Sequence, residues 1–75
     1  MKLVSQDREK VIEFKDLFII TAQNGKNGYW AIKPVQSWRS FDLGVYKTFE
    51  RNKEVLEEVM RAYLKGEKAF YMPEE

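Results

Sequence analysis

Apolar and polar positions alternate in short blocks over the first half of the chain, and these blocks predict short β-strands. The segments 2–5 and 11–14 flank a polar stretch, which is typical of a hairpin. Residues 17–23, LFIITAQ, carry β-branched and aromatic side chains and predict a further strand. The sequence NGKNG at 24–28 contains two Asn-Gly pairs, which supply the positive φ angles of tight hairpins. We therefore expect the strand at 17–23 to pair antiparallel with the strand that follows this turn.

The aromatic segment 29–34, YWAIKP, has the two-residue period of a strand with one face in water. Because Lys33 should face water, alternation places Trp30 in the core and puts three side chains on the wet face: Tyr29, Ala31 and Lys33. Pro34 donates no ladder hydrogen bond, so the chain there lies at an edge or leaves the sheet.

A second alternating segment, FDLGVY at 41–46, is expected to bury Phe41 and to turn Tyr46 toward water. Gly44 within this segment indicates a bulge or the close approach of another element. Trp38 belongs to the irregular stretch 35–40, where alternation assigns it no orientation.

The period of the hydrophobic positions changes after residue 48 to the spacing of three and four that predicts a helix. Thr48 is a suitable N-cap, and Glu50 is a favourable acid in the first turn. Gly66 predicts the end of the helix, and 68–73 is expected to return as a short strand. The apolar stripe expected to face the sheet consists of Val55, Leu56, Val59, Met60 and Tyr63.

These elements predict an α+β fold: an antiparallel sheet of five or six short strands with one C-terminal helix packed on one face. The 75 residues are expected to form a single domain. A domain of this size buries only about 60% of the surface that its unfolded chain exposes. The chain has no cysteine for disulfides and no histidine. Self-association into a homodimer is therefore the remaining way to bury more apolar surface.

Charge and apolar runs bear on the compartment and on the partners. The longest apolar run, 17–20, is far shorter than the roughly 20 residues of a membrane-spanning helix. We therefore expect a cytoplasmic protein with no membrane partner, which the lack of cysteine fits. The net charge is only +1, but residues 24–49 carry four basic side chains and one acid. The same segment holds six of the eleven aromatic side chains.

Three motifs resemble a family of short uncharacterised proteins of low-GC Gram-positive bacteria, their prophages and their phages. They are the opening Ser-Gln-Asp in KLVSQD, the Leu-Gly-x-Tyr in LGVYKT, and the Thr-capped helix that leads to a Met-Pro near the end. The likeness covers about the first seven residues and the last thirty-odd, and Asn52 stands where many members have alanine. The family has no activity to carry over, so the resemblance implies a small accessory protein, of mobile-element origin, whose motifs are structural.

No catalytic or metal site is expected from the residue types. Most nucleophile–base arrangements need His or Cys, and so do the usual zinc, copper and haem sites. The carboxylate pairs lie in polar stretches that do not push their pKa values apart, so we expect no enzyme activity and no cofactor. NGKNG lacks the strand–loop–helix context of a phosphate loop, which favours the hairpin. The Glu-rich outer face of the helix is expected to be solvated, with a docking surface or a nucleic-acid mimic as the alternative.

The candidate site is an aromatic–basic patch made of Tyr29, Lys33, Trp38, Arg39 and Tyr46. Trp, Tyr and Arg dominate the binding energy of protein interfaces. The sequence therefore predicts a small non-enzymatic interaction module, an inhibitor or adaptor that binds a protein partner. The alternative is a nucleic-acid or nucleotide binder, in which bases stack on the same aromatic rings. Four cations would give such a binder only weak, salt-sensitive affinity.

Overall fold

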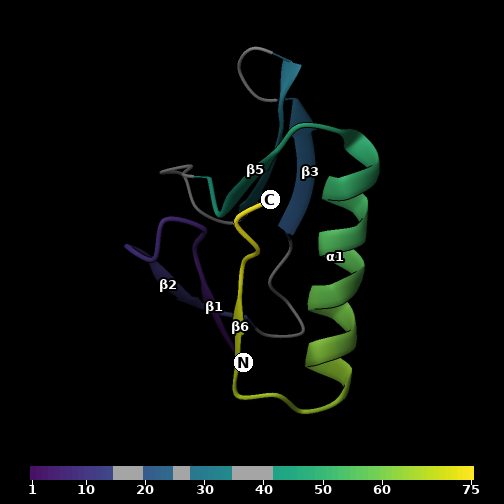
Figure 1. The fold of residues 1–75 in the computed structure, drawn as a ribbon. Helices are drawn as coiled ribbons and strands as arrows, with labels where there is room; N and C mark the ends of the chain where they lie inside the picture. Colours follow the sequence, from purple (N-terminus) through teal and green to yellow (C-terminus); the bar gives the residue numbers. More distant parts are fainter. Residues whose placement is uncertain (15–19, 25–27, 35–41) are drawn as a thin grey trace.

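The computed structural model describes residues 1–14, 20–24, 28–34 and 42–75. This part of the chain forms an α+β fold with one helix and small sheets, which confirms the predicted class (Figure 1). In chain order the elements are β1 (Lys2–Val4), β2 (Val11–Glu13), β3 (Ile20–Asn24), β4 (Trp30–Pro34), β5 (Gly44–Tyr46), α1 (Phe49–Leu64) and β6 (Ala69–Tyr71).

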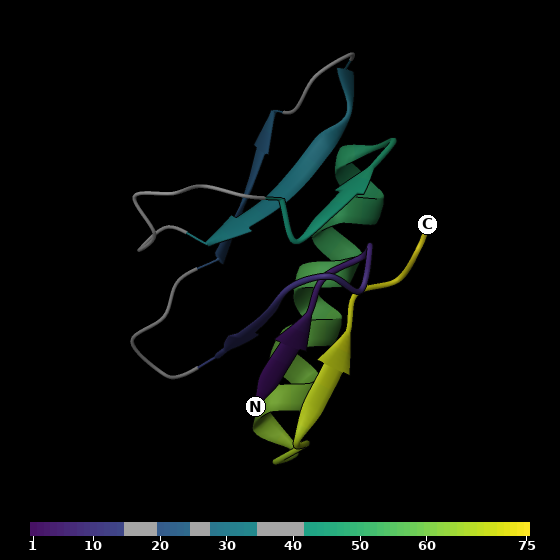
Figure 2. The same ribbon diagram turned by 90° about the vertical axis from the view of Figure 1, so that its left-hand side faces the viewer.

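The first sheet has the strand order β2-β1-β6 and joins the two ends of the chain. β1 and β2 form the predicted antiparallel hairpin, in which Leu3 lies opposite Ile12. β6 pairs with the other edge of β1 and runs parallel to it, with Leu3 opposite Phe70. β6 has this direction because the chain returns to the first sheet along α1, as the two ribbon views show (Figures 1 and 2).

The second sheet has the order β3-β4-β5 and is antiparallel throughout. β3 and β4 form the hairpin that the sequence predicts, with Asn24 opposite Trp30. Gly28 has a φ of +75°, the conformation for which a glycine in this turn was expected. The middle of the turn, 25–27, lies outside the described residues. Pro34 pairs with Ile20 at the end of β4, where the described part of the strand stops.

The prediction of one antiparallel sheet is wrong, because the strands divide into two sheets and one of these contains a parallel pair. Both sheets lie on the same side of α1, one along its first half and the other along its second half (Figures 1 and 2). The order of the strands along the chain does not predict this division into two sheets. Which strands pair depends on contacts between residues that are far apart in sequence.

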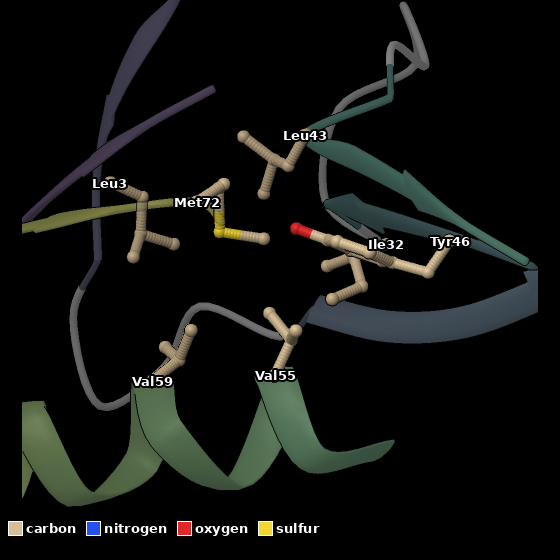
Figure 3. Close-up of a cluster of buried hydrophobic side chains, with 7 residues drawn as sticks. All are labelled: Leu3, Ile32, Leu43, Tyr46, Val55, Val59 and Met72. Carbon is tan, nitrogen blue, oxygen red and sulfur yellow. The ribbon is translucent and has the colours of Figure 1, made fainter. Parts of the chain in front are cut away.

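The hydrophobic core lies between the two sheets and α1, and all three elements contribute to it (Figure 3). Leu3 and Met72 come from near the ends of the chain, Val55 and Val59 from the helix, and the remainder from the second sheet and the bend before β5. The buried members of the cluster are Leu3, Ile32, Leu43, Tyr46, Val55, Val59 and Met72. Residues from both ends of the sequence therefore meet in one core.

The ends of α1 follow the sequence signals. Thr48 is the N-cap, and its Oγ1 accepts a hydrogen bond from the Arg51 N–H at 3.1 Å. Lys65 is the C-cap, and Gly66 follows it with a φ of +78°. In the described part of the chain, no helical segment has both the length and the apolar character needed to cross a membrane.

The face of α1 that contacts the core is turned relative to the predicted stripe. Val55 and Val59 are buried as expected, but Met60 is 56% exposed, so its assignment to the core is wrong. Asn52 is buried instead, one turn before Val55. Asn52 lies on the same face of the helix as Val55 and Val59, because it precedes them by three and seven residues. The predicted stripe was built from apolar residues alone and therefore left this asparagine out.

Candidate binding site

The structure describes three of the five residues of the predicted aromatic–basic patch, Tyr29, Lys33 and Tyr46. Tyr29 is exposed, and Lys33 is half-buried with its Nζ 3.4 Å from Asp42 Oδ1. Trp38 and Arg39 lie outside the described residues, and so does Phe41. Within the described part of the patch, Lys33 is therefore a cation whose charge is already compensated by a neighbouring carboxylate.

The other predictions for β4 are met only in part. Trp30 is half-buried rather than a member of the core, and its ring packs against Phe49 at 4.8 Å between centroids. Ala31, expected on a wet face, is fully buried. β4 lies between β3 and β5. The simple rule of one wet face and one dry face therefore fails for this central strand.

The predicted orientation of Tyr46 is wrong, because only 2% of its surface is exposed. Alternation failed here because the chain bends at Leu43 and β5 begins only at Gly44. Leu43 and Gly44 are consequently both buried although they are adjacent. The Tyr46 ring lies over Gly44, where a Cβ would come within 2.6 Å of the tyrosine hydroxyl. The close approach predicted at Gly44 is thus made by the side chain two residues later.

The hydroxyl of Tyr46 connects β5 to the last residues of the chain. It donates a hydrogen bond to the Pro73 carbonyl oxygen at 2.8 Å. Burial of the ring raises the pKa of Tyr46 to about 12, and the nearby Glu58 carboxylate acts in the same direction. Arg51 and Arg8 oppose this rise. The group therefore stays protonated and keeps donating to Pro73 over the physiological pH range.

Gln6 occupies the free edge of β5 and acts as a substitute for a neighbouring strand. Its backbone N–H donates to the Leu43 carbonyl at 2.7 Å, and its side-chain Oε1 accepts from the Val45 N–H at 2.9 Å. Its Nε2 lies 3.2 Å from the Val45 carbonyl and 2.7 Å from the Glu74 carbonyl, both of which accept. A further acceptor is the Pro73 carbonyl at 3.1 Å. One glutamine thus joins the two sheets and the C-terminal segment.

The residues that flank Gln6 hold the turn in which it lies. The Ser5 hydroxyl donates to Asp7 Oδ1 at 2.5 Å and accepts from the Lys10 N–H at 3.0 Å. The bond from Ser5 lowers the pKa of Asp7, and the Glu9 N–H and the charge of Lys10 lower it further. This network fixes the Ser-Gln-Asp turn, and its role in the described structure is to position Gln6.

Arg8 links the same turn to the first sheet. It has a φ of +64°, which is uncommon for a residue other than glycine. Its Nη1 donates to the Met72 carbonyl at 2.9 Å, and its guanidinium lies 5.3 Å from the centre of the Tyr71 ring. The strained backbone conformation accompanies these contacts with the strand β6 and the residue after it.

A groove opens beside this junction, between β5, the start of α1 and the end of the chain. Its volume is about 440 Å³. Its walls are formed by Tyr29, Val45, Tyr46, Lys47, Thr48, Arg51, Glu74 and Glu75. Two residues of the predicted patch, Tyr29 and Tyr46, therefore meet here, and Lys33 is not among the lining residues. The sequence signal for the groove was weak, because Gln6 and Glu74 are brought to it only by contacts distant in sequence.

The charges along the groove largely cancel. Lys47 and Arg51 contribute two positive charges, and Glu74 and Glu75 contribute two negative side chains. Arg51 is already engaged, since its Nε donates to the Glu75 carbonyl at 2.9 Å and its Nη1 lies 3.7 Å from Glu58. Lys47 is exposed and makes no ion pair with another described residue. The groove is thus a mixed polar and aromatic surface with one unengaged cation.

Comparison of the chain with protein-family models, curated proteins and solved structures finds no match. The residues that line the groove are therefore the basis for assigning its chemistry. Across the described segments, no group of three or more acidic side chains is placed to hold a metal ion. The groups that line the groove can donate and accept hydrogen bonds, form ion pairs and stack against a ligand. Interactions of these kinds hold a bound ligand in place.

Proposed function

We propose that the chain is a small non-enzymatic binding module that receives a segment of a protein partner in the groove. The observation that supports this most directly is the groove itself. Its volume of about 440 Å³ lies in the range of ordinary ligand sites. Tyr29 forms an exposed aromatic wall, and Lys47 supplies the cation that fixes a ligand's orientation.

The balance of charge favours a protein segment over a nucleic acid. A nucleic-acid site needs several unengaged cations, because affinity follows the number of phosphates that are neutralised. In the groove the two basic residues face two glutamates, and Lys33 is compensated by Asp42. A peptide carries both polar and apolar groups and meets such a surface without an excess of like charge.

The groove is preformed, which supports binding without a large ordering cost. Gln6 holds the backbone of Val45 on one wall and that of Glu74 on another. Tyr46 holds Pro73, which precedes Glu74. A site whose walls are fixed before binding loses less conformational entropy when the ligand arrives. The likeness to mobile-element proteins would give this module the role of an inhibitor or adaptor of a host protein, as part of the same proposal.

Selection of peptides from a random library against the wild-type protein tests the proposal. Selected peptides are then titrated against Tyr29→Ala and Lys47→Glu, which alter the groove. We expect each substitution to weaken binding by about tenfold or more, as at interface residues that carry binding energy. The matched controls are Tyr71→Ala and Lys68→Glu, which change an exposed tyrosine and an exposed lysine away from the groove. Equal losses in the groove variants and the controls would contradict the proposal.

Titration with nucleotides and short oligonucleotides at two salt concentrations separates the alternative function. Binding that depends on Tyr29 and falls steeply with salt would replace the protein-binding proposal with nucleic-acid or nucleotide binding. The fluorescence of Trp30, which is half-buried beside Phe49, provides one signal. We expect no saturable change with either ligand class.

A further inference from the structure

α1 carries an apolar stripe that does not face the core. Phe49 is 44% exposed, Met60 is 56% exposed and Leu64 is 76% exposed. At about 100° per residue these three side chains lie on one side of the helix, together with the half-buried Leu56. We call Phe49, Leu56, Met60 and Leu64 the helix stripe. The centre of the helix stripe lies about 100° around the helix axis from the centre of the buried face of α1.

The helix stripe holds much of the exposed apolar surface of the described residues. The described residues include six large exposed hydrophobic side chains, and three of the six belong to this stripe. The Trp30 ring packs on Phe49 and extends the apolar surface beyond the helix. Single exposed apolar residues are ordinary, but a contiguous group marks an interaction surface.

The charges beside the helix stripe are divided along the helix axis. On the flank that faces away from the sheets, the first half of α1 has Glu50 and Glu54, and Glu57 lies just past its middle. The last turn and the C-cap carry Arg61 and Lys65 on the same flank. Arg61 and Glu57 lie 3.9 Å apart as an exposed pair, which is weak in water. The flank therefore has an acidic half and a basic half.

A second copy of the chain complements this pattern if its helix runs antiparallel. In a two-fold pair of antiparallel helices, each flank meets the same flank of the other helix. The acidic half of one helix then lies against the basic half of the other, and the two helix dipoles also oppose each other favourably. A parallel pair would instead place this flank against the other flank of the partner helix, so its acidic and basic halves would not meet, and the two helix dipoles would point the same way.

We propose that the protein forms a homodimer in which two α1 helices pair antiparallel through the helix stripe. Lys53 lies within the stripe, where its aliphatic stem covers apolar surface while its ammonium group stays in water. Burial across the two-fold axis compensates for the small core of a 75-residue chain.

The dimer leaves the groove open and therefore goes beyond the proposed function. Arg51, which lines the groove, lies on the side of α1 opposite Met60, since nine residues correspond to two and a half turns. Each dimer accordingly presents two grooves. Failure of peptide binding and failure of dimerisation are separate results, because they depend on different residues.

Sedimentation equilibrium over a concentration series tests the apolar part of the proposal. We expect wild-type protein to approach twice the 9.0 kDa mass of one chain. The variant with Met60→Gln and Leu64→Gln keeps good helix formers at exposed positions. Each substituted side chain occurs twice in the interface, so we expect the dissociation constant to rise by about 100-fold or more. Val11→Gln changes an equally exposed side chain in the first sheet and should leave the mass unchanged.

Charge reversal tests the antiparallel arrangement. One variant carries Glu54→Lys with Glu57→Lys, and the other carries Arg61→Glu with Lys65→Glu. We expect each variant alone to be monomeric, because like charges then predominate along the whole of its flank. An equimolar mixture should form a heterodimer, in which unlike halves meet again. Circular dichroism confirms that each variant keeps its helix.

Three results would overturn the proposal. The first is a wild-type protein that stays monomeric up to concentrations used for NMR. The second is a dimer whose dissociation constant is unchanged by the Met60 and Leu64 substitutions. The third is a pair of charge variants that associate with themselves as well as with each other.

Discussion

Two amide side chains lie at the margins of the same core and have opposite surroundings. Gln6, at the junction of the two sheets, bonds to Val45 through both its oxygen and its nitrogen, and its nitrogen also reaches the C-terminal segment. Asn52, on the inner face of α1, is fully buried, and neither its Oδ1 nor its Nδ2 has a hydrogen-bond partner in the described structure.

The difference lies in what each amide replaces. The Gln6 amide takes the place of a backbone peptide group at the edge of β5, so it satisfies polar groups that would otherwise lack a partner. The Asn52 amide replaces an apolar group on the buried face of α1 and loses its hydration without compensation. The first side chain therefore stabilises the fold and shapes the groove, and the second lowers stability.

Replacement of Gln6 should have the largest effect on stability. Gln6→Met keeps the length of the side chain but removes its donors and its acceptor. We expect the free energy of unfolding to fall by about 2–4 kcal/mol, because several backbone groups lose partners together. Urea denaturation measures the change. The exposed, neighbouring Glu9→Met should leave the midpoint nearly unchanged. A loss for Gln6→Met no larger than that for Glu9→Met would contradict the proposed role of this amide.

Gly44→Ala should be the next most damaging change. The new Cβ would lie 2.6 Å from the Tyr46 hydroxyl and 2.9 Å from its ring, so the buried ring must move. We expect a loss of about 1–3 kcal/mol, the usual cost of overpacking a core. A double-mutant cycle with Tyr46→Leu supplies the control, since the alanine should cost less once the ring is gone. Strict additivity of the two changes would show that the contact is not responsible.

The Tyr46 hydroxyl predicts a stability change at alkaline pH. Its pKa is raised to about 12 in the folded protein against 10.0 for the ordinary group. The folded state therefore favours the protonated form, and this contribution is complete below pH 10. It should fall by about 2–3 kcal/mol as the pH rises from 10 to 12, because the unfolded chain ionises first.

Tyr46→Phe should remove this step and should cost about 1 kcal/mol at neutral pH through loss of the bond to Pro73. Thermal unfolding at a series of pH values records both effects, with Tyr71→Phe as the control at an exposed tyrosine. A wild-type curve with the same alkaline slope as that of Tyr46→Phe would rule out the assigned cause.

Asn52→Ala should have the smallest effect and the opposite sign. Alanine removes the unpaired amide and has a higher helix propensity, so we expect a gain of about 1 kcal/mol despite the small cavity. Asn52→Asp should instead destabilise the fold, because it buries a carboxylate in the same position. The two unfolding midpoints should lie on opposite sides of the wild-type value. A lower midpoint for the alanine variant would mean that the amide has a partner in solution.

The elements that sequence reasoning found are those with local signals. Thr48 and Gly66 mark the ends of α1 through contacts within one helical turn, and the Asn-Gly pairs indicate the β3–β4 hairpin. Local chemistry of this kind is readable because its partners are a few residues away. The same holds for the β1–β2 hairpin.

The features that sequence reasoning did not find depend on contacts between residues that are distant in sequence. Gln6 and Val45 are hydrogen-bonded although they are 39 positions apart in the sequence, and Gln6 and Glu74 are 68 positions apart. No local pattern distinguishes this glutamine from a solvated one. Tyr46 was misplaced because one bend at Leu43 shifts the phase of alternation. The groove consequently became visible only in the folded chain, whereas Tyr29 was placed correctly on an exposed surface. The resemblance to mobile-element proteins stays a prediction.

The backbone amide of Val45 provides the most direct test of the central claim that Gln6 substitutes for a strand and fixes the wall of the groove. Hydrogen exchange followed by NMR compares this amide with that of Leu43, which donates to the Ile32 carbonyl within the second sheet. We predict that both amides are protected in wild-type protein. In Gln6→Met, protection of Val45 should fall well below that of Leu43. A Val45 amide that exchanges in wild-type protein as fast as an unprotected one would contradict the account.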